Sequence, residues 1–89
     1  MSRLVEVTAT GDVTTATAHL HSVVLTGGSD AATLVVKEGG SGGTTILSLK
    51  APANTSVFWE AGDSDGVQCS GGIHATTTGT GETASFEYR

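Results

Sequence analysis

Apolar and polar residues alternate over short stretches of this chain, and clusters of glycine, aspartate, serine and asparagine separate the stretches. Threonine is the commonest residue and glycine the next, whereas no window has the periodicity of an amphipathic helix. Short runs of this kind are typical of strands in an antiparallel sandwich or barrel. The expected strands are Arg3–Ala9, Val13–Ala18, Leu20–Thr26, Ala32–Lys37, Thr44–Lys50, Thr55–Glu60, Val67–Cys69, Gly72–Thr78 and Thr83–Tyr88.

The segments between these stretches have the composition of turns. Thr10–Asp12, Gly27–Asp30 and Gly62–Gly66 supply residues that accept positive φ angles or bond their side chains to the backbone. Pro52, the only proline, falls between two expected strands and marks a corner. Gly79–Gly81 predicts a hairpin that joins the last two strands.

Strict alternation assigns the core-facing side chains, because successive residues of a strand point to opposite faces of the sheet. The fold class is therefore all-β, and we expect a single antiparallel β-sandwich domain of about eight strands, jelly-roll-like, over residues 1–89. The expected inward residues include Ala84, Phe86 and Tyr88, Ile73 and Ala75, Leu34 and Val36, Leu47 and Leu49, and Val57 and Trp59.

Composition indicates that this domain has a thin core. Only 37% of the 89 residues are hydrophobic and 4% are aromatic, and Cys69, the only cysteine, cannot form a disulfide within its own chain. Small domains without disulfides often gain stability from partner subunits. Oligomerisation is therefore the expected source of support.

Charge excludes one class of partner. The net charge is -5, and the four basic residues, Arg3, Lys37, Lys50 and Arg89, are too few and too dispersed to follow a phosphate backbone, so no nucleic acid is expected. The N-terminal residues lack a basic region followed by an apolar core, and no apolar run approaches the length of a membrane span. We expect a soluble protein that is made in a cytoplasm and binds no membrane.

His19 and His21 form the strongest candidate for chemistry, because residues two apart in a strand project to the same side and imidazoles bind first-row metals. His74 or Cys69 could supply a third ligand. Cupins, which are also small jelly rolls, carry such a His-x-His followed by a glutamate, and that carboxylate is missing after His21. We therefore expect surface or interface histidines rather than a metal site.

Other motifs favour ordinary structural interpretations. Glu60, Asp63 and Asp65 lack a further oxygen donor that a calcium loop needs, which favours a solvated acidic turn. The glycine cluster at 39–43 precedes a strand rather than a helix and predicts a flexible hairpin loop. Cys69 has no neighbouring cation in sequence and is expected to be an inert, half-buried thiol. The chain has no Gly-x-Ser-x-Gly elbow. No catalytic, cofactor-binding or metal-binding residue, no cofactor and no enzyme activity are expected.

The segments LHSVVLTGGSDAATLVVKEG, TTILSLKAPANTSVFWE and GVQCSGGIHATTTGTGETASFEYR give an order of strands and turns that spans most of the chain from Leu20 onward. This order resembles the small all-β virion proteins of tailed bacteriophages, several of which decorate or cement the capsid as trimers. The resemblance implies a homotrimer that binds the major capsid protein on the capsid surface of the virion, after assembly in the host cytoplasm. It assigns no role to Cys69 or Trp59.

Two alternatives remain open. One is a fibre, spike or adhesion module that binds host-surface carbohydrate, and the other is a small metal-dependent jelly-roll enzyme. Sugar sites favour exposed aromatic side chains. The aromatic candidates are Phe58, Trp59, Phe86 and Tyr88, and alternation assigns most of them to the core, which weighs against the adhesion module.

Overall fold

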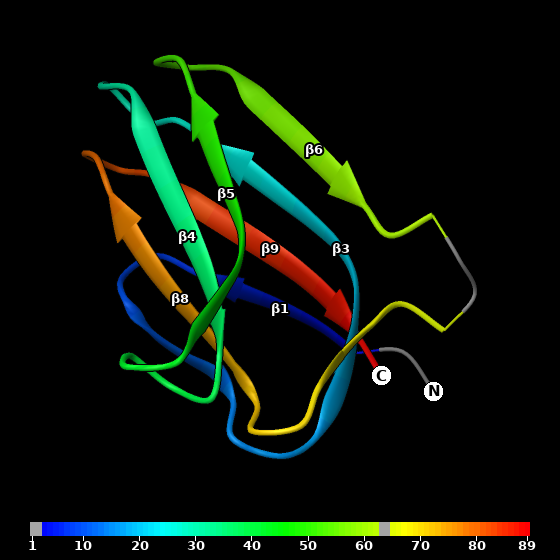
Figure 1. The fold of residues 1–89 in the computed structure, drawn as a ribbon. Helices are drawn as coiled ribbons and strands as arrows, with labels where there is room; N and C mark the ends of the chain where they lie inside the picture. Colours follow the sequence, from blue (N-terminus) through cyan, green and yellow to red (C-terminus); the bar gives the residue numbers. More distant parts are fainter. Residues whose placement is uncertain (1–2, 63–64) are drawn as a thin grey trace.

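The computed structural model describes residues 3–62 and 65–89, and this part of the chain is all-β, with nine strands and no helix. A strand is present in every stretch that alternation predicted, with some shifts at the ends (Figure 1). The strands are β1 (Arg3–Val7), β2 (Gly11–Thr14), β3 (Ala18–Thr26), β4 (Ala32–Glu38), β5 (Thr44–Ala51), β6 (Ser56–Glu60), β7 (Val67–Cys69), β8 (Ile73–Thr78) and β9 (Thr83–Tyr88).

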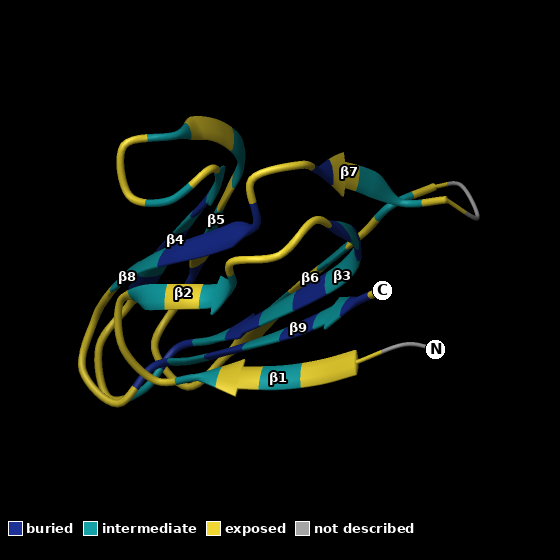
Figure 2. Ribbon diagram, turned by 90° about the horizontal axis from the view of Figure 1, so that it is seen from below, coloured by how far each residue is buried: buried dark blue, intermediate teal, exposed yellow. Residues whose placement is uncertain are grey.

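Two antiparallel sheets pack face to face as a sandwich, as expected (Figure 2). Sheet A has the order β1-β9-β3-β6, with β7 beside the first part of β3, and sheet B has the order β2-β8-β4-β5. The pairs are nested, because β1 pairs with β9, β2 with β8, β3 with β6 and β7, and β4 with β5. The chain therefore follows the path of one long hairpin, closed between β4 and β5 and rolled into two layers.

The predicted hairpin at Gly79–Gly81 is wrong. β8 lies in sheet B and β9 in sheet A, so this segment crosses from one layer to the other. Both strands bury apolar side chains between the layers, Ile73 and Ala75 from sheet B and Ala84, Phe86 and Tyr88 from sheet A. The crossing packs against the β3–β4 connection, where the Ser29 N–H donates to the Thr80 carbonyl oxygen (3.0 Å).

The predicted turn at Thr10–Asp12 and the predicted strand at Val13–Ala18 are also wrong in part. Gly11 and Asp12 belong to β2 and pair with β8, so the bend lies before them, at residues 8–10. β2 ends at Thr14, whose Oγ1 accepts a hydrogen bond from the Ala16 N–H (3.3 Å). This local bond competes with strand pairing and turns the chain toward β3.

The core lies between the two sheets, and its largest fully buried side chains include Phe86, Leu20, Leu25, Leu34 and Ile73. Alternation assigned the inward faces of β4, β8 and β9 correctly for these apolar positions. The predicted inward residues of β5 and β6 are only partly buried, because both strands are edges of their sheets, whereas Ala51 at the end of β5 is fully buried. The four predicted residues are Leu47, Leu49, Val57 and Trp59.

A β-bulge in β3 changes which residues face the core. Ala18 and Leu20 are buried in the first half of the strand, whereas Val23 and Leu25 are buried in the second half. The register against β9 shifts between Leu20 and Ser22, so one extra residue, His21, takes up the change of phase. The bulge therefore keeps both halves of β3 in the core.

Candidate functional site

The hollow that contains both candidate histidines lies at one end of sheet A. It has a volume of about 180 Å³ and is lined by His19, His21, Asp65 and Arg89. Two backbone hydrogen bonds join His19 to Arg89, the residue that follows β9. The His19 N–H donates to the Arg89 carbonyl oxygen (2.7 Å), and the Arg89 N–H donates to the His19 carbonyl oxygen (2.9 Å). His19, His21, Asp65 and Arg89 thus border an open hollow at the surface.

The bulge and its neighbours position His21. The His21 carbonyl oxygen accepts a hydrogen bond from the Ala61 N–H (2.9 Å), which fixes the bulge against the end of β6. On the other side, Gly66 lies so close that a Cβ there would be 2.6 Å from the Leu20 carbonyl oxygen and 3.2 Å from the His21 ring. The φ of Gly66 is 72°, which also favours glycine. The backbone at Gly66 is therefore packed closely against the His21 imidazole.

The hydrogen bond of His19 defines its tautomer. Its Nδ1 lies 3.0 Å from the backbone carbonyl oxygen of Asp65, and a carbonyl oxygen only accepts, so Nδ1 carries the hydrogen. In the neutral ring, Nε2 is then the nitrogen with the lone pair. The hollow therefore offers an imidazole nitrogen that can accept a hydrogen bond, in a lining that also contains Asp65 and Arg89.

Neither candidate for a third ligand lies in the described lining beside the two histidines. The described lining of the hollow contains neither Cys69 nor His74. Cys69 is fully buried in β7 and His74 lies in sheet B. In residues 3–62 and 65–89, no three His, Cys, Asp or Glu side chains form a group suited to a metal ion. The expectation that the chain binds no metal stays a prediction.

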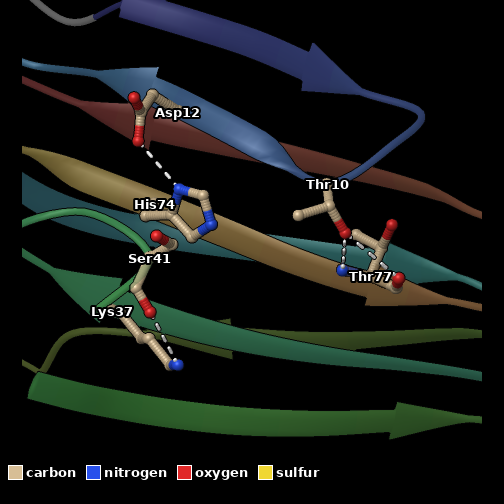
Figure 3. A network of polar contacts seen from close by, with 6 residues as sticks. All are labelled: Thr10, Asp12, Lys37, Ser41, His74 and Thr77. Atoms are coloured by element: carbon tan, nitrogen blue, oxygen red, sulfur yellow. Dashed lines mark hydrogen bonds and ion pairs between the residues drawn. The ribbon is translucent and has the colours of Figure 1, made fainter. Parts of the chain in front are cut away.

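His74 forms a second polar cluster, on the outer face of sheet B (Figure 3). It is 6% exposed, and its Nδ1–H donates to Oδ1 of Asp12 across the β2–β8 pair at 2.8 Å. Lys37 is opposite His74 on the β4 side, and its ammonium donates to the Ser41 carbonyl oxygen (3.0 Å). The buried Nε2 of His74 has no hydrogen-bond partner in the described structure. The pattern of the sequence gave no sign of this cluster, because its members come from three separate strands and the β4–β5 loop.

The remaining motifs have structural roles where the structure describes them. Asp63, part of the predicted acidic turn, lies outside the described residues, and Glu60 ends β6 on its exposed face. The glycine cluster at 39–43 is the loop of the β4–β5 hairpin, as predicted. Gly39 and Gly40 both have φ of 93°, and the Gly43 N–H donates to the Gly40 carbonyl oxygen (3.0 Å). Because a strand follows this loop, it has no helix N-terminus to hold a phosphate.

Cys69 is more deeply buried than predicted, with an exposure of 0%. Burial raises the pKa of its thiol, and the negative charge of Glu38 raises the pKa further. A buried thiol with a raised pKa is a poor nucleophile, and the inertness of Cys69 stays a prediction.

We expect the Cys69 thiol to make folding stability fall in alkaline solution. Its raised pKa means that the folded chain keeps a proton that the unfolded chain loses, so its contribution to stability declines as pH rises through 9.0, the ordinary value, toward the folded value. Urea unfolding at several pH values should show a steeper alkaline decline for the natural chain than for Cys69→Ala. Parallel declines in both proteins would contradict the assignment.

Two apolar sides of the sandwich are the features that alternation alone did not reveal. The β1–β2 side contains the partly buried Val5, Val7 and Val13, and the β5–β6 side contains the partly buried Ile46, Leu47, Leu49, Val57 and Trp59. Leu4 is 78% exposed and Phe58 is 62% exposed, and they are the exposed large hydrophobic residues of the described chain. They lie on β1 and β6, the opposite edges of sheet A.

No protein-family model, curated protein or solved structure matches the chain. The described part of the chain has no helix with the length and hydrophobicity needed to cross a bilayer. The fold and the two apolar sides are therefore the findings from which a function is inferred.

Proposed function

We propose that this chain is a structural protein of a tailed-bacteriophage virion, a decoration or cement protein that stabilises the head shell. It binds the major capsid protein as a homotrimer on the capsid surface, after synthesis in the host cytoplasm. The observation that carries the proposal is the pair of apolar sides, which suit assembly between protein surfaces. The proposed function involves neither nucleic acid nor a membrane as a partner.

The nested strand pairing supports a jelly-roll fold as part of this proposal. A jelly roll is a double sheet of eight strands built from a long rolled hairpin, and it occurs in viral capsid proteins and in lectins. Here β6 and β7 share one side of β3 and together take the place of one strand, which reduces the nine strands to eight positions.

The thin core supports an oligomer. The partly buried valines, leucines and tryptophan at the two sides keep apolar surface in contact with water in a single chain. Burial of that surface against other subunits is favourable, in proportion to the apolar area removed from water. A decoration protein works in this way, because it adds buried area at junctions of the shell instead of performing a reaction.

One observation favours the alternative, an adhesion module of a fibre or spike. Phe58 is an exposed aromatic side chain on the outer face of sheet A, and Glu60 on the same strand face offers carboxylate oxygens. Stacking on an aromatic ring together with hydrogen bonds to a carboxylate is a common way to bind a sugar. Lectin domains also use jelly rolls.

The deciding experiment is co-sedimentation of the purified protein with expanded phage heads that were assembled without it. We expect saturable binding, a number of bound chains in multiples of three, and greater resistance of the decorated heads to heat. Heads of the same phage that already carry the protein serve as the control and should bind no additional protein.

Glycan-array binding tests the alternative with the same preparation, and Phe58→Ala is the matched variant. Protein that ignores undecorated heads and binds host glycans through Phe58 would reject the decoration proposal and favour the adhesion module. Protein that binds heads and no glycan would support the decoration proposal and reject the adhesion module.

A further inference from the structure

The exposed large apolar residues of the described chain occupy corresponding places on the two opposite edges of sheet A. Within residues 3–62 and 65–89, no strand pairs with the outer edge of β1 or with the outer edge of β6. Free strand edges present unpaired N–H and C=O groups, which makes them templates for pairing with another chain. An exposed leucine on one of these edges and an exposed phenylalanine on the other add apolar surface that pairing would remove from water.

Leu4 and Phe58 point to the same face of the sheet. Leu4 is opposite Glu87, Glu87 is opposite Ser22, and Ser22 is opposite Glu60, so these residues form one row. Residues that are directly opposite in a sheet share a face, and Phe58 is two residues from Glu60. The row therefore places both exposed apolar side chains on the outer face.

The direction of the strands also fits. β1 is antiparallel to β9, β9 to β3, and β3 to β6, so β1 and β6 run in opposite directions at the two edges. When a second copy is placed beside the first in the same orientation, its β1 lies next to the first copy's β6 and runs antiparallel to it. The two edges of one chain are thus complementary to each other.

We propose that the β1 edge of one copy of this chain pairs with the β6 edge of the next copy, in the antiparallel register that sets Leu4 opposite Phe58. Sheet A then continues from copy to copy. The inference rests on the homo-oligomer in the proposed function and specifies how its subunits meet.

The register is selected by the side chains that it brings together. With Leu4 opposite Phe58, Val5 falls opposite Val57 on the inner face, and Arg3 falls opposite Trp59, where its guanidinium can lie over the indole ring. Glu6 falls opposite a serine. A register shifted by two residues would place Leu4 opposite Glu60. It would also bring Glu6 and Glu60, the glutamates of these two edges, closer to each other. Charge and apolar contact therefore favour the same register.

Sheet B contributes a second layer to the same contact. The next copy's Val13 side approaches the Leu47 and Leu49 side of the first copy, because β2 and β5 are the corresponding edges of that sheet. The two surfaces differ, so the contact is heterologous, and such contacts close into a ring or continue as a filament. Closure after three copies gives the proposed homotrimer.

Disulfide trapping tests this pairing in the full-length chain, with Cys69→Ala as the background so that no native thiol remains. We expect Leu4→Cys combined with Phe58→Cys to form a covalent trimer under oxidised glutathione. A mixture of the two single-cysteine proteins should form a mixed dimer. Both substitutions are at exposed positions, so the monomer is expected to fold.

The matched control is Glu6→Cys combined with Glu60→Cys, on the same two strands and the same face. In the proposed register these positions are offset by four residues, or about 13 Å, which is too far for a disulfide. Cross-linking of this control, or of Phe58→Cys with itself, would overturn the proposed register and the heterologous pairing.

Light scattering and head binding separate this inference from the proposed function. A trimer that binds heads but forms no Leu4–Phe58 link would overturn the inference and leave the decoration function in place. Trapped trimers that ignore heads would support the inference and reject the decoration function. A strict monomer would overturn both the homotrimer and this pairing.

Discussion

Replacement of Phe86 by alanine is expected to lower the free energy of unfolding by about 3–5 kcal/mol. Phe86 is fully buried at the centre of sheet A. It is opposite Val5 on one side and Val23 on the other, and Val23 is in turn opposite Trp59, so one apolar row crosses the whole sheet. Loss of the ring leaves a cavity in this row. Because β9 is hydrogen-bonded to a strand on each side, the backbone cannot move inward to fill the cavity.

Urea unfolding followed by circular dichroism measures this effect. For an 89-residue domain, such a loss is a large part of a total stability of about 5–10 kcal/mol. Phe58→Ala makes the same chemical change at an exposed position and should cost less than about 1 kcal/mol at a concentration where the chain is monomeric. Equal losses for the two variants would show that Phe86 is not at the centre of the core.

Substitution of Gly28 by alanine is expected to cost about 3 kcal/mol, the second largest effect. A Cβ at this position would be 1.9 Å from the Thr80 carbonyl oxygen and 2.5 Å from the carbonyl carbon of Gly81. Both contacts are with backbone, so no side chain can rotate away. Relief requires the two connections that cross between the sheets to separate, which strains the bond from Ser29 to Thr80.

Thermal and urea unfolding of Gly28→Ala should be compared with those of Gly42→Ala. Gly42 lies in the β4–β5 loop, and a Cβ there has no atom within 4 Å. The control should therefore change stability by no more than about 0.5 kcal/mol. A Gly28→Ala protein as stable as the control would show that the two crossing connections are not in close contact.

The sequence predicted the strands well, because alternation and turn residues are local signals. It did not predict which strands pair, since pairing joins residues far apart in the chain. The segment Gly79–Gly81 has the composition of a hairpin turn and yet joins two different sheets. Gly11 has the composition of a turn and yet lies in β2, where its backbone pairs with that of Ala75. In both places, long-range packing outweighed local preference.

The candidate site was predictable only in part, for the same reason. His19 and His21 were expected to project together, and the structure brings both to one hollow. The bulge at His21 was not predicted, because Val23, Val24 and Leu25 are all apolar and leave the phase of the strand open. The exposure of Leu4 and Phe58 was not predictable, because it depends on β1 and β6 being edges, which only the complete topology decides.

The nested pairing has a consequence for the order of folding. β4 and β5 form the one hairpin between consecutive strands in the described chain, so their pairing closes the shortest loop. Each further pair encloses the one before it, and the contacts become steadily less local. Folding is therefore expected to start at β4–β5, to proceed outward and to be slow for a domain of this size. We therefore expect the β1–β9 pair to form last, so that Tyr88 must leave the ribosome before sheet A can be complete.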